Sequence, residues 1–282
     1  MSVSPEAITA GASIRPVDLI RVSPQGRESR SDAAAAEEPL EIRLHGSPFV
    51  MTMRTPGDDK ALVAGFLLSE RIITSADDIG AIRHCIEEDQ AAAGNVIDVT
   101  LTGSAAQRAT AALSERRLVT ATSACGVCGR RSIDDLMRDL TRIDATWSIS
   151  ADVIAALPPR LREAQTAFDE TGGLHAAGLF GRDGVLAGIA EDVGRHNAVD
   201  KVIGARILQD DMPLGDRVLC VSGRTSFEIV QKAVVAGIPI VAAVSAPSSL
   251  AIDLARSANL TLLGFVRGDT FNIYSGADRI TS

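Results

Sequence analysis

The chain has 282 residues, of which 46% are hydrophobic and 3% aromatic, and its formal net charge is −8. This length and apolar content indicate a globular protein large enough for two domains. The acidic balance excludes a general binder of nucleic acid or of a membrane surface, and the few aromatic residues exclude a base-stacking platform for single strands. Four cysteines make no disulfide framework. The sequence has no membrane-spanning run or secretory signal, so we expect a cytoplasmic protein.

The first part of the chain predicts a flexible extension followed by a smaller α+β domain. Residues 1–37 are rich in Ser, Ala, Pro and Glu and show no sustained periodicity, which is typical of a loose segment. The smaller domain is expected over residues 38–145. Its predicted elements are a hairpin, a helix, a third strand and a closing helix, at 40–44 and 49–53, 61–68, 96–101 and 133–143.

Residues 146–282 predict a second domain, a mixed sheet with helices on both faces. The order of its elements resembles the cytidine-deaminase-like fold. A helix over 153–168 is expected to be interrupted at Pro158 and Pro159. The other predicted helices and strands alternate after a hairpin, with helices at 197–208, 226–236 and 250–258 and strands at 176–180, 185–190, 217–221, 238–244 and 260–265.

Two cysteines three residues apart, Cys125 and Cys128, stand in the glycine-flanked segment Ser-Ala-Cys-Gly-Val-Cys-Gly-Arg-Arg at 123–131. A segment with so few bulky side chains favours a reachable loop. The two arginines and a predicted helix start should lower the thiol pKa, which favours a nucleophilic or sulfur-carrying cysteine. Half of a zinc site and a pair of inert hydrophobes are the alternatives. Cys85 and Cys220 stand alone in apolar surroundings and do not complete a zinc site.

Three predicted strand-to-helix junctions, at 191–197, 222–228 and 245–249, contain Gly, Ser and Thr. In open sheets of this kind, ligands bind beyond the carboxyl ends of the strands, where helices begin. Free backbone N–H groups and hydroxyls at a helix start suit phosphate, and Arg195 and Arg224 could each grip an anion. Ordinary capping explains any one junction, but three at one sheet edge favour a phosphate-bearing ligand.

The deaminase-like order of elements also permits a test for zinc deaminase chemistry. Those enzymes need His-x-Glu at one helix start and Pro-Cys-x-x-Cys at the next. The first position here reads His196-Asn197-Ala198, and the second, at 223–226, contains no cysteine. Zinc deaminase chemistry is therefore excluded, and we expect no metal site. His196 is left as a hydrogen-bonding partner of a ligand or as a structural histidine.

Several motifs occur together in a specific order, above all Cys-Gly-Val-Cys-Gly at 125–129, Gly-Arg-His-Asn at 194–197 and Ser-Gly-Arg-Thr-Ser at 222–226. With them the chain resembles the formate dehydrogenase accessory sulfurtransferase family, FdhD, from about Pro39 to the C-terminus. The other matching segments are those at 38–43, 64–70, 192–193, 198–201, 245–251 and 264–268.

The resemblance implies a sulfurtransferase. Such proteins take sulfur as a persulfide from a cysteine desulfurase and pass it to the molybdenum bis(molybdopterin guanine dinucleotide) cofactor, which formate dehydrogenase then receives. The resemblance also implies a cytoplasmic homodimer that binds a GDP-like nucleotide, with Cys125 as the persulfide carrier and Cys128 assisting. The family's cofactor-binding segment falls on Phe265, Val266, Arg267, Gly268, Asp269 and Thr270. The junctions contribute the other candidate cofactor-binding residues, Arg195, His196, Asn197, Ser222, Gly223, Arg224, Thr225, Ser226, Ser248 and Ser249.

Three other functions stay open on the residues alone. A non-catalytic chaperone would bind the guanine dinucleotide without using its thiols, and a thiol-disulfide oxidoreductase would use only the cysteine pair. A metal site could combine Cys125 and Cys128 with His175 or His196. The guanine pocket is also open, because Phe265 and Phe271 could stack on a base or belong to the core.

Overall fold

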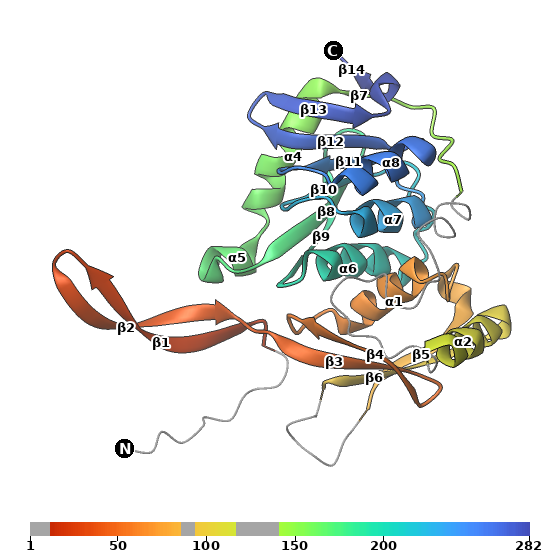
Figure 1. The fold of residues 1–282 in the computed structure, drawn as a ribbon, viewed down its shortest axis with the longest axis horizontal. Coiled ribbons are helices and arrows are strands. Elements are labelled where there is room, and N and C mark those ends of the chain that lie inside the picture. The colour runs from red at the N-terminus through yellow and green to blue at the C-terminus, as the bar shows by residue number, and fades with distance from the viewer. Residues whose placement is uncertain (1–11, 86–93, 117–140) are drawn as a thin grey trace.

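The structure is a computed structural model that describes residues 12–85, 94–116 and 141–282. Figure 1 shows three parts: a large sheet with its helices, a smaller sheet beside it, and a narrow two-stranded arm. Cys125, Cys128 and most of the helix expected at 133–143 lie outside the described residues. None of the helices in the described ranges is long and apolar enough to cross a membrane.

The large sheet has six strands in the order β13-β12-β11-β10-β8-β9. The strands are β8 His175–Phe180, β9 Leu186–Asp192, β10 Val218–Val221, β11 Ile240–Ala243, β12 Thr261–Arg267 and β13 Thr270–Ser275. β10, β11 and β12 are parallel, and β9 runs the same way because both β9 and β10 are antiparallel to β8. The carboxyl ends of four strands therefore reach one edge of the sheet.

Side chains of the central strands alternate between two packed faces of the large sheet. Leu219 and Val221 of β10 pack on the side of three helices, α6 Arg195–Ile207, α7 Phe227–Val235 and α8 Ser249–Ser257. Val218 and Cys220 of the same strand pack on the side of α4 Ala151–Glu163. This confirms the expected mixed α/β sheet with helices on both faces (Figure 1).

Helix α4 continues through Pro158 and Pro159, so the expected interruption is wrong. Each proline removes one intrahelical hydrogen bond. The helix holds its path because Ile154, Leu157 and Leu161, all on one helix face, are buried in the core beneath the sheet. The remaining short elements are α5 Thr166–Thr171, β7 Ile149–Ser150, η2 Ala277–Arg279 and β14 Ile280–Thr281.

The smaller sheet has four strands in the order β4-β3-β6-β5. Its elements are β3 Glu38–Leu44, β4 Ser47–Arg54, α1 Asp59–Ser69, η1 Ala76–Asp78, β5 Ile79–His84, β6 Val96–Leu101 and α2 Gly103–Arg116. The predicted hairpin, first helix and third strand are confirmed, whereas β5, α2 and, in the large sheet, β13 were not predicted. Figure 1 shows α1 between the two sheets, and one cluster of buried hydrophobic residues includes both α1 and α6. The boundaries 38–145 and 146–282 stay a prediction.

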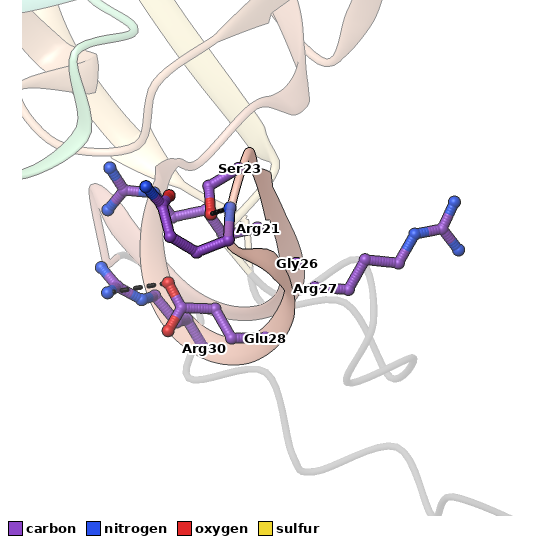
Figure 2. Close-up of a pocket in the computed structure, with 7 residues that line it drawn as sticks. Arg21, Ser23, Gly26, Arg27, Glu28 and Arg30 are labelled. Atoms are coloured by element: carbon purple, nitrogen blue, oxygen red, sulfur yellow. Dashed lines mark hydrogen bonds and ion pairs between the residues drawn. The ribbon is translucent and has the colours of Figure 1, made fainter.

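The arm is an antiparallel hairpin of β1 Ile14–Ser23 and β2 Gly26–Ala35. The expectation of a loose segment without regular structure is wrong for these residues. No residue of either strand is buried, so the arm lacks the core-facing apolar alternation by which strands are found in a sequence. Figure 2 shows the tip, where arginines surround a surface pocket of about 340 Å³ and Arg30 forms an ion pair of 2.8 Å with Glu28.

Candidate functional site

The second and third strand-to-helix junctions of the large sheet, at 222–228 and 245–249, are joined by backbone hydrogen bonds. Thr225 donates its N–H to the carbonyl of Ala246 at 3.2 Å, and Ser248 donates its N–H to the carbonyl of Thr225 at 2.9 Å. The parallel bridge between Thr225 and Pro247 follows from this pairing. The loops before α7 and α8 are thus one structural unit at the carboxyl edge of the sheet.

The end of β12 belongs to the same edge. Phe265 donates its N–H to the carbonyl of Ser245 at 3.2 Å, and the Arg267 Nε donates to the carbonyl of Val244 at 2.9 Å. The strand is irregular here, with a register shift between Gly264 and Arg267. The candidate residues of the β12–β13 turn therefore lie beside the third junction.

The first junction is connected to this edge through His175 at the start of β8. His175 lies opposite Asp192, the last residue of β9. Its Nδ1 is 3.2 Å from the position of a Cβ built on Gly223, so the second junction passes close to the ring. Burial lowers the pKa of His175, and the positive charges of Arg195 and Arg224 lower it further. The sequence predicted His175 only as a metal ligand and missed its place among these arginines.

The candidate residues differ in which part of each residue a ligand can reach. Val266 is fully buried in the core beside α4, so a ligand can meet only its backbone. Phe265 has a positive φ of 54° and is 38% exposed, which places its ring on the surface. Phe271 is partly buried against that core. The exposed candidates are Arg224, Ser248, Ser249, Phe265, Arg267, Gly268, Asp269 and Thr270.

Several candidate side chains already have partners within the protein. Asn197 donates from Nδ2 to the carbonyl of Met53 at 2.7 Å and to Asp192 Oδ1 at 2.9 Å. Ser222 accepts the N–H of Ala176 at 2.9 Å, and Ser248 caps α8 by accepting the N–H of Ala251 at 3.3 Å. Through these hydrogen bonds within the protein, the three side chains hold the loops of the sheet edge in position.

Two buried polar atoms at the edge have no hydrogen-bond partner among the described residues, the Arg195 Nε and the Thr225 Oγ1. Thr225 is only 1% exposed. Buried polar atoms without partners are rare in folded proteins, because each costs about 1–3 kcal/mol. Together with the arginines and the helix starts, they make this edge suited to a ligand rich in hydrogen-bonding oxygens, such as a pyrophosphate.

A buried ion pair anchors the first junction to the smaller sheet. The Lys201 Nζ is 2.8 Å from Asp192 Oδ2 and donates to the carbonyl of Thr55 at 2.7 Å. Thr55, directly after β4, donates its N–H to Asp192 Oδ2 at 3.1 Å. Asp192 and Lys201 were read in the sequence only as members of a motif, and their structural role was missed.

The His196 ring contacts two side chains at the start of α7: Ser226, the N-cap residue of that helix, and Glu228 in its first turn. Its Nε2 is 2.9 Å from Ser226 Oγ, and its Nδ1 is 3.1 Å from Glu228 Oε2. Burial lowers the pKa of His196 to about 4, against the opposing effect of Glu228. The imidazole is therefore neutral at pH 7.

Glu228 connects His196 to a buried charge cluster. Lys232, one turn along α7, is 3.4 Å from Glu228 Oε1 and 2.8 Å from both carboxylate oxygens of Asp200. Asp200 also lies 3.1 Å from the Ser69 hydroxyl of α1. Burial raises the pKa of Asp200 to about 6, and the two carboxylates raise the pKa of Lys232.

The thiols that the structure describes are not at this edge. Cys220 is buried in β10, and burial raises its pKa to about 12, which makes it unreactive. Cys85 is partly buried at the end of β5. Within the described ranges, no three His, Cys, Asp or Glu side chains are placed to hold a metal ion together.

Comparison with known proteins supports one family over nearly all of the chain. A model of the FdhD/NarQ family matches residues 35–281. The chain belongs to the FdhD/NarQ family. All of the arm except its last residue, Ala35, lies before the matched range, whereas both cysteines of the 125–129 motif and every candidate residue of the sheet edge fall inside it.

Relatives of this FdhD/NarQ chain carry the name "Sulfur carrier protein FdhD". The protein from Nocardia farcinica is 51% identical over 269 residues, covering 94% of each chain. The protein from Streptomyces coelicolor is 49% identical over 272 residues, covering 93% of this chain and 94% of the relative. A crystal structure from Desulfotalea psychrophila, described as that of a formate dehydrogenase accessory protein, has a TM-score of 0.76 at 24% identity. It covers 96% of this chain and 100% of that chain. The two chains thus share one fold.

Proposed function

We propose that this protein is a sulfur carrier that accepts persulfide sulfur from a cysteine desulfurase and transfers it to the molybdenum bis(molybdopterin guanine dinucleotide) cofactor. Formate dehydrogenase then receives the sulfurated cofactor. The observation that carries the proposal is the identity of about half of all residues, over more than nine-tenths of the chain, with relatives named sulfur carriers. The proposal includes a cytoplasmic homodimer.

The proposed loading step uses Cys125. Its thiolate attacks the terminal sulfur of the desulfurase persulfide, which forms the Cys125 persulfide and releases the desulfurase cysteine as a thiolate. Release of that sulfur at the sulfide level, as a ligand for molybdenum, takes two electrons from a thiol reductant and returns Cys125 to the thiolate form, while Cys128 assists as the neighbouring thiol. Oxidation state is conserved in the loading step, because one sulfur–sulfur bond breaks and another forms.

The proposed docking site for the acceptor is the carboxyl edge of the large sheet. Arg195, Arg224 and Arg267 supply positive charge near the helix starts, which suits the two pyrophosphates of the dinucleotide. Phe265 is exposed beside Arg267, whose guanidinium carbon is 5.7 Å from its ring centroid, and an exposed aromatic ring suits stacking with guanine. GDP is therefore a suitable probe for this site.

The loading step is tested with the full chain, a cysteine desulfurase and L-cysteine. Intact-protein mass spectrometry should show a gain of one sulfur atom, and peptide mapping should place it on Cys125. The Cys125→Ala variant should show no gain, whereas Cys85→Ala, which removes a cysteine outside the motif, should be loaded like the wild type. Absence of the gain in the wild-type protein would refute the proposal.

A non-catalytic cofactor chaperone is the second candidate, because the arginines of the edge suit the nucleotide without any thiol. The two functions differ in the Cys125→Ala/Cys128→Ala variant. A chaperone should still restore formate dehydrogenase activity in cells that lack the wild-type protein. A sulfur carrier should restore none, although the variant should bind GDP as the wild type does.

A further inference from the structure

Ser226, His196 and Glu228 are arranged as a hydroxyl, an imidazole and a carboxylate in sequence. The hydroxyl oxygen is 2.9 Å from Nε2 of the ring, and the carboxylate is 3.1 Å from Nδ1. Ser226 and Glu228 come from the start of α7, and His196 comes from the first turn of α6. This is the order of contacts in which an imidazole activates a serine for nucleophilic attack.

The direction of the hydrogen bond between His196 and Ser226 follows from the charges around the ring. His196 is neutral at pH 7 because burial lowers its pKa to about 4, so its ring has one N–H. A carboxylate can only accept, so Glu228, whose Oε2 lies 3.1 Å from Nδ1, favours that proton on Nδ1. The Nε2 lone pair is left facing Ser226, whose hydroxyl must donate.

The Ser226 hydroxyl is not used as a helix cap, although the residue occupies the N-cap position of α7. Its side chain makes no cap hydrogen bond. Ser248, at the same position of the neighbouring helix α8, does cap by accepting the N–H of Ala251 at 3.3 Å. The comparison shows that His196 diverts the Ser226 hydroxyl from the bond that its position would favour.

The three side chains are reachable from solvent. The side chain of His196 is 24% exposed and that of Glu228 is 16% exposed, while Ser226 is partly buried. Ser226 is the N-cap residue of α7, and the first backbone N–H groups of a helix have no acceptor within the helix. Such N–H groups can stabilise an oxyanion. The charge of Arg195 also acts on His196, which gives the site a cationic surrounding.

We propose that Ser226 is the nucleophile of an acyl-transfer site, with His196 as its base and Glu228 as the residue that orients the base. The substrate class is a carboxylic ester that carries an anionic group, which Arg195 and Arg224 favour. This activity needs neither Cys125 nor Cys128, so it is independent of sulfur transfer.

The step balances without a further reagent. The Ser226 oxygen bonds to the ester carbon while its proton passes to His196 Nε2, and the tetrahedral intermediate then expels the alcohol, which takes the proton from His196. The product is an acyl-serine. Water attacks this ester by the same route and releases the carboxylic acid.

The first experiment is covalent labelling of the full wild-type chain with a fluorophosphonate, followed by intact mass and peptide mapping. We expect one adduct, on Ser226. Ser226→Ala should remove it, and His196→Gln should slow labelling roughly 100-fold or more, as expected for loss of a general base. Ser257→Ala, which removes an exposed hydroxyl at the end of α8, is the matched control and should label like the wild type. No adduct on the wild type, or equal labelling of Ser226→Ala, would overturn the proposal.

A second measurement uses only wild-type protein and so does not depend on how the variants fold. With a neutral imidazole as the base, the labelling rate should be nearly constant between pH 6 and 8. A serine without a base would react about tenfold faster per pH unit, because its attack would depend on hydroxide, and that slope would refute the proposal. Release of p-nitrophenol should be faster from the p-nitrophenyl monoester of succinate than from p-nitrophenyl acetate, and the reverse order would contradict the assigned substrate class.

Discussion

At the residue scale, the chemistry of the edge depends on a buried cluster behind it. Lys232 holds the negative charges of Asp200 and Glu228, and Glu228 in turn orients His196. Lys232 and Asp200 are each no more than 3% exposed. Because buried charges are tolerated only when paired, each member of the cluster constrains the others.

We predict that His196 stays neutral well below the usual titration range of histidine. Its pKa is lowered from 6.5 to about 4, so the unfolded chain binds a proton at this ring between those pH values and the folded chain does not. The stability that His196 contributes therefore falls as the pH falls through this range. Nitrogen-15 NMR of the imidazole should show the Nδ1–H form at pH 6. A doubly protonated ring at that pH would contradict the structure.

The effect on stability is measured as a difference between wild type and His196→Gln. Asp200, whose pKa is raised to about 6, acts in the opposite direction, because the folded state binds its proton first. Since Asp200 is present in both proteins, its contribution is largely removed from the difference. The variant should lose less stability than the wild type between pH 6.5 and 5.

Replacement of Lys232 by methionine should destabilise the fold by about 3 kcal/mol or more, because it leaves the buried carboxylate of Asp200 and the partly buried one of Glu228 without their cation. Urea unfolding measures this change. The double variant Lys232→Met/Asp200→Asn should be less destabilised than the sum of the two single changes. Lys60→Met, at an exposed lysine of α1, is the control and should alter the stability by no more than about 0.5 kcal/mol. A single variant as stable as the wild type would contradict the role given to the cluster.

At the element scale, helices α1 and α6 approach each other through two glycines. A Cβ on Gly204 would lie 1.8 Å from the carbonyl oxygen of Ala61, and a Cβ on Gly65 would lie 2.0 Å from that of Asp200. Both obstacles are backbone atoms, which cannot move aside as a side chain can. The close contact brings the Ser69 hydroxyl within reach of Asp200.

Gly204→Ala should therefore force α1 and α6 apart and destabilise the protein by about 3 kcal/mol. Thermal or urea unfolding measures the loss. Gly215→Ala is the matched control, because its added Cβ would meet nothing nearer than 3.9 Å and should change the stability by less than about 0.5 kcal/mol. Equal stability of the two variants would show that the helices are not in this contact.

The elements found from the sequence are those with a strong apolar pattern. All four residues of β10 and of β11 are buried, and the continuous apolar runs predicted both strands. β5 was missed because it has no buried residue, and α2 was missed because the face that it packs on the core consists mostly of alanine, a weak apolar signal. Helix α4 was misread at its prolines because the packing of its buried face on the sheet is a long-range effect.

The candidate edge was predictable for the same reason that the parallel strands were. Glycine, serine and arginine directly after apolar runs marked the junctions, and the topology brought them together. The buried partners of these residues were not predictable, because Asp192, Lys201 and Lys232 meet their partners only through the packing of α6 and α7. The sequence predicted Ser226 only as one candidate cofactor-binding residue among several, and only its distance to His196 distinguishes it.

At the scale of the whole molecule, the arm (β1 and β2) and the body, which comprises the two larger sheets with their helices, are stabilised by different interactions. The arm is stabilised by its own strand pairing and contains no buried residue, whereas Leu40, Ile42 and Leu44 of the next strand are each 1% exposed or less. The arm also exposes Ile20 and Val22, at 65% and 68%. Burial of apolar side chains therefore begins to stabilise the fold at β3.

Removal of residues 1–35 should leave the body folded, with a change in the free energy of unfolding of less than about 1 kcal/mol. Urea unfolding and circular dichroism measure this. Removal of residues 1–44, which also takes away β3 from the centre of the smaller sheet, should abolish cooperative unfolding. A body that unfolds with the shorter deletion would contradict this division.

The hydrogen bonds of Thr55 have a consequence for communication across the molecule. Thr55 is hydrogen-bonded to Asp192 and Lys201, so the end of strand β4 and the loop that presents Arg195 are coupled and should shift together. An anion captured by that arginine would thus be sensed at the Thr55 amide, some 140 positions earlier in the sequence, as slower exchange of its hydrogen with solvent. Binding of an anion at the edge of the large sheet should thus be detectable at the smaller sheet.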